Sequence, residues 1–189
     1  MKGILFVVSC FVFSSLLLIS CDTNGAKGTN SNITFSKIHE VINESFEIED
    51  RLDGNLNLDQ YKDEIFVIRY NKTGRRSLLI CFGANNDEYE LYLNSSITLL
   101  SREDASAEDP YIEILTKEGK FTIVHSVPNQ DSCTIAHEFS YDKNQNQFFL
   151  SQISTECAGG DNTGSSASIR TTSDFGKVNL FDFNIQKDY

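Results

Sequence analysis

The sequence predicts a mainly β protein: a single antiparallel meander sheet domain with minor helix, preceded by a signal peptide and a flexible tether. Three observations carry this prediction. Val, Ile, Phe, Tyr and Thr cluster in short runs, as they do in strands. Residues typical of turns separate these runs at hairpin spacing. No segment repeats at the period of a solenoid or a propeller, so one sheet domain is expected.

The predicted strands are joined mostly as hairpins. The turn over residues 71–76 contains Gly74, and Gly119 supports the positive φ of a tight turn over 117–119. Another turn is expected over 142–146. Residues 36–43 have helical spacing, with a lead-in to a strand as the alternative, and 181–185 are too short to assign. The expected strands are residues 64–70, 77–82, 88–93, 111–116, 120–126, 134–141 and 147–155.

The first twenty residues have the layout of an export signal. Lys2 provides a positive start, and residues 4–19 are apolar except for three serines; this stretch is too short for a confident membrane span. The run Leu18-Ile19-Ser20-Cys21 matches the bacterial lipobox. The sequence therefore predicts cleavage of residues 1–20 and lipidation of Cys21. The alternative is an ordinary signal peptide that contains a cysteine by chance.

Residues 21–31 are mostly polar and contain two glycines, which predicts a flexible tether between the lipid and a domain over residues 32–189. Lipid chains at Cys21 would hold the protein on the periplasmic side of a bacterial envelope membrane. Asp22 resembles the inner-membrane retention signal of enteric bacteria. Because other bacteria sort lipoproteins differently, the choice between inner and outer membrane stays open.

The chain is strongly acidic, with 27 acidic against 16 basic side chains and a net charge of −11. Nucleic acid and anionic lipid surfaces would repel such a protein. The charge instead favours a basic protein partner in the periplasm or a cation, or it serves solubility alone.

The five cysteines have different expected roles. Cys10 would leave with the signal segment, and Cys21 would carry lipid. Cys81 lies in an apolar run, where a thiol behaves as a small buried hydrophobe. A turn centred near residue 145 would bring Cys133 opposite Cys157, and the periplasm allows a disulfide. The sequence predicts this pairing and contains no closely spaced cysteines typical of a metal site.

Residues 53–64 carry oxygen-bearing side chains at alternate positions directly before a strand, as calcium-binding loops do. The segment resembles the loop of FG-GAP and VCBS-type repeats. The resemblance implies Asn55, Asn57, Asp59 and Asp63 as metal ligands. Asn55 replaces an aspartate and Gln60 replaces the turn glycine of that pattern, so only weak calcium binding is expected. The alternative is a turn in which Asn and Asp side chains bond their own backbone.

A broader similarity extends from about residue 54 to residue 184. It includes Asp109-Pro110 before a hairpin and the runs 121–125, 139–142 and 174–178. In this order the chain resembles a group of uncharacterised secreted and lipid-anchored proteins of Gram-negative bacteria that carry one degenerate repeat. The resemblance implies fold and compartment, and it brings no catalytic residues.

The sequence does not predict an enzyme. Its histidines are His39, His125 and His137, and no G-x-S-x-G motif accompanies them. His125 and His137 fall on strands expected to pair, yet two histidines without a third ligand make a weak metal site. A hydrolase would need a pocket joining one of them to an acid.

A lipoprotein that acts through protein contacts, without catalysis, is therefore the leading expectation. An immunity protein against a basic, periplasm-acting toxin is a sharper version, with the acidic loop over residues 101–110 as the contact. A weak calcium-binding module is the other alternative.

Overall fold

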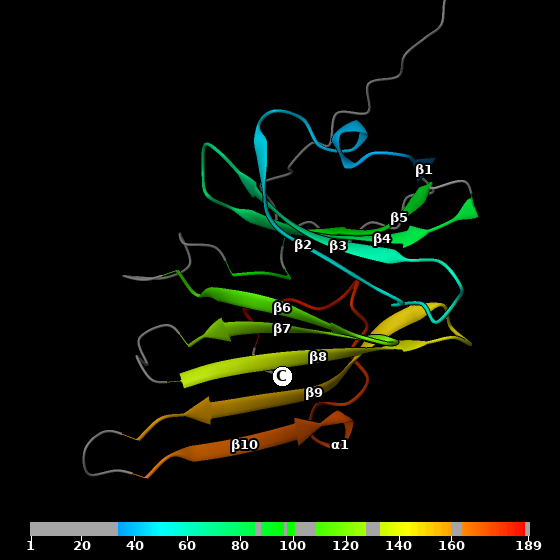
Figure 1. Cartoon of the computed structure of the whole chain (residues 1–189). Coiled ribbons are helices and arrows are strands. Elements are labelled where there is room, and N and C mark those ends of the chain that lie inside the picture. Colours follow the sequence, from blue (N-terminus) through cyan, green and yellow to red (C-terminus); the bar gives the residue numbers. More distant parts are fainter. Residues whose placement is uncertain are drawn as a thin grey trace, which may run out of the picture.

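The protein is described by a computed structural model, which places residues 34–85, 88–96, 98–100, 109–127, 133–159 and 164–187. The predicted signal segment, the lipidation site Cys21, the tether and residues 101–108 of the acidic loop lie outside these ranges. Figure 1 shows two sheets, one above the other. The prediction of a mainly β, antiparallel fold with minor helix is confirmed, and the meander is divided between the two sheets.

The first sheet has the order β1-β5-β4-β3-β2, with every neighbouring pair antiparallel. Its central strands β3 and β4 are buried almost throughout, which explains their continuous apolar sequences. A short 3-10 helix, η1 (Ile38–Glu40), follows β1. The strands are β1 (Thr34–Phe35), β2 (Phe46–Gly54), β3 (Asp63–Tyr70), β4 (Arg76–Gly83) and β5 (Tyr89–Ser95).

The second sheet has the order β10-β9-β8-β7-β6, and again each pair is antiparallel. In β8 and β9 a register shift between Glu138 and Phe139 marks a bulge. The elements are β6 (Tyr111–Lys117), β7 (Lys120–Ser126), β8 (Cys133–Asp142), β9 (Gln147–Cys157), β10 (Ser166–Thr171) and the helix α1 (Thr172–Phe175).

Two apolar clusters hold the fold together. The larger joins one face of each sheet and includes Phe121, Phe139 and Phe148, and the C-terminal residues Leu180 and Phe183 complete it. The smaller covers the opposite face of the first sheet with the N-terminal residues, Phe35 and Val41 among them. The first sheet is therefore buried on both faces, whereas the second has one face open to solvent, as antiparallel sheets commonly do.

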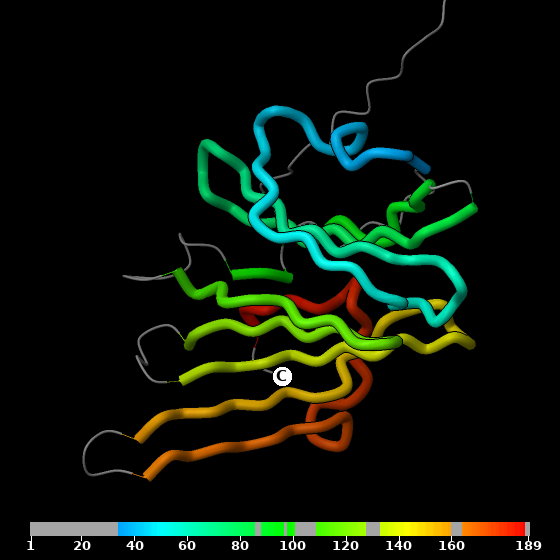
Figure 2. Tube along the Cα trace, viewed as in Figure 1, coloured from blue at the N-terminus to red at the C-terminus, as the bar shows by residue number. Residues whose placement is uncertain are grey.

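The two sheets also meet along one side, where the edge strands β2 and β6 run next to each other. The Thr116 hydroxyl donates to the Asp53 carbonyl at 3.1 Å, and the Gly119 N–H donates to the Asn55 carbonyl at 2.9 Å. The tube in Figure 2 shows β2 passing toward the β6–β7 turn. These contacts occupy edges that would otherwise present unpaired backbone groups.

The chain departs from the sequence-based expectations at its two ends. The helical spacing over residues 36–43 corresponds to only the three residues of η1. Residues 181–185 form turns and irregular backbone, with no helix. Directly before them, the chain pairs with β9 through Leu150 N–H to the Val178 carbonyl at 2.9 Å, and this contact leads the C-terminal segment into the core.

Candidate functional site

The predicted calcium loop connects β2 to β3 and lies against two hairpin turns of the second sheet. Gly119 in the β6–β7 turn approaches the Leu58 side chain closely. From the β8–β9 turn, the Lys143 ammonium donates to the Leu58 carbonyl at 2.8 Å. The loop therefore lies at the end of the molecule where elements of both sheets converge.

Asp63 is the fully buried centre of this loop, with 0 % of its surface exposed. Its Oδ2 accepts the backbone N–H groups of Leu56 at 2.6 Å and Asn57 at 3.0 Å. Its Oδ1 accepts the N–H of Gly83 at 2.9 Å. Burial raises the pKa of the carboxyl above its usual value, although the three N–H groups act in the opposite direction. Asp63 thereby joins the loop to β4.

The other three predicted ligands bond mainly to the loop itself. Asn57 Oδ1 accepts the Asp59 N–H at 3.0 Å, and Asp59 Oδ1 accepts the Tyr61 N–H at 2.6 Å. The Asn55 amide donates to the Asp59 carbonyl at 2.8 Å. These are the side-chain to backbone bonds typical of Asx turns. Asn55 Oδ1 is buried and has no hydrogen-bond partner within the described part of the chain.

The loop conformation bears on whether a cation fits. The positive φ lies at Leu58, at 62°, and not at Gln60, which occupies the turn-glycine position of the pattern. Most side-chain oxygens face N–H groups, and the Lys143 ammonium contacts the loop. Within the described ranges no three His, Cys, Asp or Glu side chains are grouped to hold a metal ion. The structure thus accounts for the loop by its own hydrogen bonds, and calcium binding stays a prediction.

Replacing Gly83 by alanine tests how closely β4 must approach this loop. A Cβ there would lie 2.3 Å from the Lys62 carbonyl oxygen, so the backbone would have to shift and the bond from Gly83 to Asp63 would weaken. We expect Gly83→Ala to lower the free energy of unfolding by about 2–3 kcal/mol, measured by urea titration. Gly164→Ala is the matched control, since a Cβ there meets nothing within 4 Å. Equal effects of both substitutions would contradict the close approach.

His125 and His137 do come together, as the predicted strand pairing implied. Their rings stack at 5.1 Å and 6°, and each residue is 5 % exposed. Phe183 packs edge-on against His137. Burial lowers the pKa of His125 to about 4; burial and then the charges of His125 and Arg170 lower that of His137 to about 3. Both Nδ1 atoms are buried without a partner among the described residues.

This geometry bears on the chemistry open to the two histidines. In a face-to-face stack the in-plane lone pairs of the rings point in parallel instead of converging on one ion. No group of three potential metal ligands was found in the described ranges. His39, the remaining histidine, is exposed on η1. The pair is best explained as neutral rings packed in the core.

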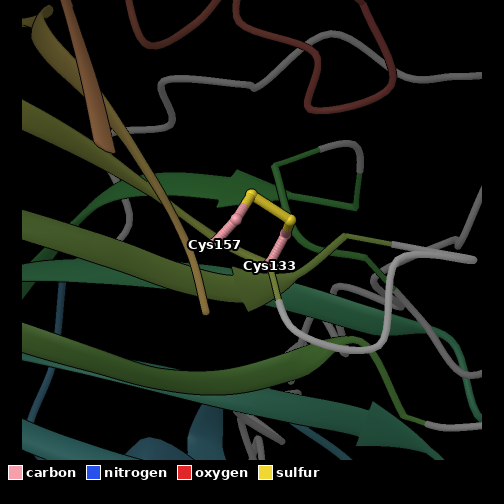
Figure 3. Close-up of a disulfide and its surroundings, with 2 residues drawn as sticks. All are labelled: Cys133 and Cys157. Carbon is pink, nitrogen blue, oxygen red and sulfur yellow. A yellow bond between two sulfur atoms is a disulfide. The ribbon is translucent and has the colours of Figure 1, made fainter. Parts of the chain in front are cut away.

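The cysteine predictions can be followed in the structure. Cys133 and Cys157 are directly opposite each other in β8 and β9 and form a disulfide, shown in Figure 3. The predicted pairing is confirmed. Cys81 is fully buried, and burial raises the pKa of its thiol far above the usual value. A thiol held protonated in this way is a poor nucleophile.

One polar cluster was not predicted from the sequence. Arg76, 3 % exposed, binds Glu49 of β2 at 2.5 Å and both oxygens of Asp109 at 2.6 and 2.7 Å. Its guanidinium lies 5.0 Å from the centre of the Tyr111 ring, and the Tyr111 hydroxyl donates to Asp50 at 3.0 Å. The bulge in β2 lies at Glu49, and the bulge in β6 directly follows Tyr111. The only sequence signal is that arginines and acids are both present, far apart along the chain.

Comparisons with known proteins add no family. The chain matched no protein-family model, no curated protein and no solved structure. The resemblance to FG-GAP and VCBS-type loops, and to Gram-negative lipid-anchored proteins, therefore stays a prediction. No helix within the described ranges is long and apolar enough to cross a membrane.

Proposed function

We propose that this protein is a bacterial envelope lipoprotein that acts through protein contacts and not by catalysis. The proposed lipid anchor rests on the run Leu18-Ile19-Ser20-Cys21, which follows a short apolar segment. The first described strand, β1, starts at Thr34, so residues 22–33 lie between it and the proposed lipid on Cys21. Diacylglycerol and acyl chains at Cys21 would then hold the β domain at the membrane surface.

The positions of the reactive side chains support a role without catalysis. A nucleophile and its base must meet in a site that substrate can reach. The two stacked histidines and the thiol of Cys81 lie in the core, and the Cys133–Cys157 disulfide leaves no thiol at the end of the β8–β9 hairpin. Protein contacts need none of these groups.

The anchoring has a direct test. Cells that express the full chain would be fed a labelled fatty acid, and the protein would be isolated and analysed by mass spectrometry. We expect label on the wild-type chain and none on Cys21→Ala. Cys10→Ala is the matched control and should incorporate as much label as wild type, because Cys10 precedes the proposed cleavage site. Unlabelled wild-type protein would refute the lipoprotein assignment.

The partner we propose is a basic protein in the periplasm, and a toxin neutralised by this chain is the sharper form. The net charge of −11 supports this choice, because complementary charge speeds association. Of the acidic loop, the structure describes only Asp109 and Pro110. Asp109 is partly buried and binds Arg76, and Pro110 is buried. Crosslinking in the envelope, followed by isolation of the tagged chain, should recover one basic partner in near-equal amount. Recovery of no partner would contradict the proposal.

Weak calcium binding is the second candidate function, and the buried Asn55 Oδ1, which has no hydrogen-bond partner among the described residues, favours it. The internal hydrogen bonds of the loop weigh against it. If this loop binds calcium, the melting temperature should rise when millimolar calcium replaces a chelator, and a shift within about 1 °C would rule the site out. Binding adds about 2.7 kcal/mol of stability at a hundredfold excess over Kd. Any such gain should disappear in Asp59→Asn, which removes a charged ligand.

A further inference from the structure

The last strand of the second sheet, β10, has an open edge. Within the described ranges it pairs only with β9, and Figure 1 shows no strand beyond it. The other sheet edges are short or occupied: β1 has two residues, and β2 and β6 contact each other. Five of the six residues of β10 are exposed, and the side chain of Ile169 stands out at 65 % exposure.

The hydrogen bonds of β8 determine which backbone groups of β10 face outward. The Cys133 carbonyl accepts the N–H of Val127, on the β7 side, so Cys133 and Cys157 form a pair that is not hydrogen-bonded. Cys157 must then direct its N–H and carbonyl toward Ser166, its partner in β10. By alternation, Ser168 and Arg170 also face β9, and the residues between them face away.

The outward-facing residues of β10 are therefore Ala167, Ile169 and Thr171. The outward N–H of Thr171 already has a partner, because it donates to Asp174 Oδ2 at 2.7 Å at the start of α1. Ala167 and Ile169 keep outward N–H and carbonyl groups. Because a single residue, Ser168, separates them, the same two residues of a second copy can pair with them in antiparallel orientation. A twofold axis at Ser168 then places Ala167 of each copy opposite Ile169 of the other.

We propose that β10 pairs antiparallel with β10 of a second copy of this chain, centred on Ser168, so that the two second sheets form one continuous sheet. The local charge at the edge of β10 favours a second copy of this chain as its partner. Copies with a net charge of −11 repel each other, but residues 166–171 contain no acid and include Arg170. Ile169 would gain apolar contact with Ala167 of the other copy. The strand also lacks the proline, bulge or row of charges that normally prevents edge pairing.

The expected dimer is weak. Two six-residue strands bury much less than the roughly 1,200 Å² of a standard interface, so Kd should be on the order of 100 µM. Because salt screens the repulsion between copies, Kd should fall about fivefold from 50 to 500 mM NaCl. The proposal holds whether or not the chain is lipid-anchored, although confinement to a membrane would raise the effective concentration.

Ser168→Cys provides the test in the full-length chain in cells. A directly facing pair that is not hydrogen-bonded has Cα atoms about 4.5 Å apart, which suits a disulfide. With an added oxidant, Ser168→Cys should give a dimer on a non-reducing gel. Arg170→Cys is the matched control on the same face of the same strand, and it should give at least tenfold less dimer, because a different residue faces it.

A second pair of variants separates edge pairing from general association. Adding Ile169→Lys to Ser168→Cys should reduce the dimer at least tenfold, whereas adding Leu115→Lys, an exposed aliphatic residue on β6, should leave it unchanged. Ala167→Pro, which removes an outward N–H, should act like Ile169→Lys. An intact Cys133–Cys157 disulfide in the same sample would show that each variant is folded. Absence of dimer in Ser168→Cys, or equal dimer in Arg170→Cys, would overturn the proposal.

Discussion

Replacing Arg76 by methionine is expected to lower the free energy of unfolding by about 3 kcal/mol. Methionine keeps an unbranched apolar stem but removes the guanidinium that Glu49 and Asp109 bind. Asp109 would then be left partly buried without the Arg76 guanidinium, and Glu49 would keep only its ion pair with Arg69 at 2.9 Å. Breaking one side of a buried ion pair typically costs 3–5 kcal/mol. The lower end applies because the Glu49 and Asp109 side chains are 21 % and 32 % exposed.

Urea unfolding of the two proteins measures this difference. The control is Lys62→Ala, which breaks an ion pair with Asp53 in which both side chains are more than half exposed. Such a pair contributes at most about 1 kcal/mol. If Arg76→Met were no more destabilising than Lys62→Ala, the Arg76 cluster would not be what joins β2, β4 and β6.

Acidification is expected to destabilise the fold through the stacked histidines. In the unfolded chain a histidine has a pKa of about 6.5, while in the folded protein burial lowers those of His125 and His137 to about 4 and about 3. Below pH 6.5 the unfolded state therefore binds protons that the folded state does not. The stability present above pH 6.5 is lost as the pH falls toward the folded values. The loss should total about 4–5 kcal/mol between pH 6 and pH 4.

Urea midpoints measured across this pH range test the effect. The double variant His125→Phe, His137→Phe keeps two stacked aromatic rings without titrating them, so its stability should change much less above pH 4.5. Below pH 4.5 carboxyl groups also contribute to the change in stability. The lowered pKa values of Glu138 and Asp142 add to the loss of stability on acidification, and the raised pKa of Asp63 opposes it. Parallel pH profiles of the two proteins would show that the histidines are not responsible.

The sequence predicted those parts of the fold whose signals are local. Strands β3 and β4 were found because both faces are buried and their apolar runs are continuous. The β6–β7 hairpin was found because Gly119 adopts a φ of 67° in its turn. Strand β2 was missed: it is an edge strand, rich in acids, and the bulge near Glu49 interrupts the alternation on which a prediction depends.

The candidate sites show the same division. The sequence identified Asp63 as a residue with a special role, but its partner Gly83 comes from another strand, so the sequence could not show that backbone N–H groups occupy its oxygens. The meeting of His125 with His137 followed from strand pairing. Phe183, which the C-terminal segment brings back across the sheet, packs against His137 and helps to bury it. Contacts between residues distant along the chain leave no local pattern to detect.

The bulge in the β8–β9 hairpin controls more than local curvature. Asp142 pairs with Gln147, so an uninterrupted ladder would place Cys133 opposite Glu156; the extra residue, Ser151, moves Cys157 into that position. Deleting Ser151 would leave the later partners unchanged, because Gln152 would then follow Leu150 directly, and the bulge would disappear. If the bulge closed while Ser151 remained, every later side chain of β9 would turn to the other face, Ile153 would leave the core and the disulfide could not form. Over evolutionary time this hairpin could change its turn residues freely and could lose Ser151, but any other insertion or deletion in β8 or β9 would need a compensating one in the partner strand.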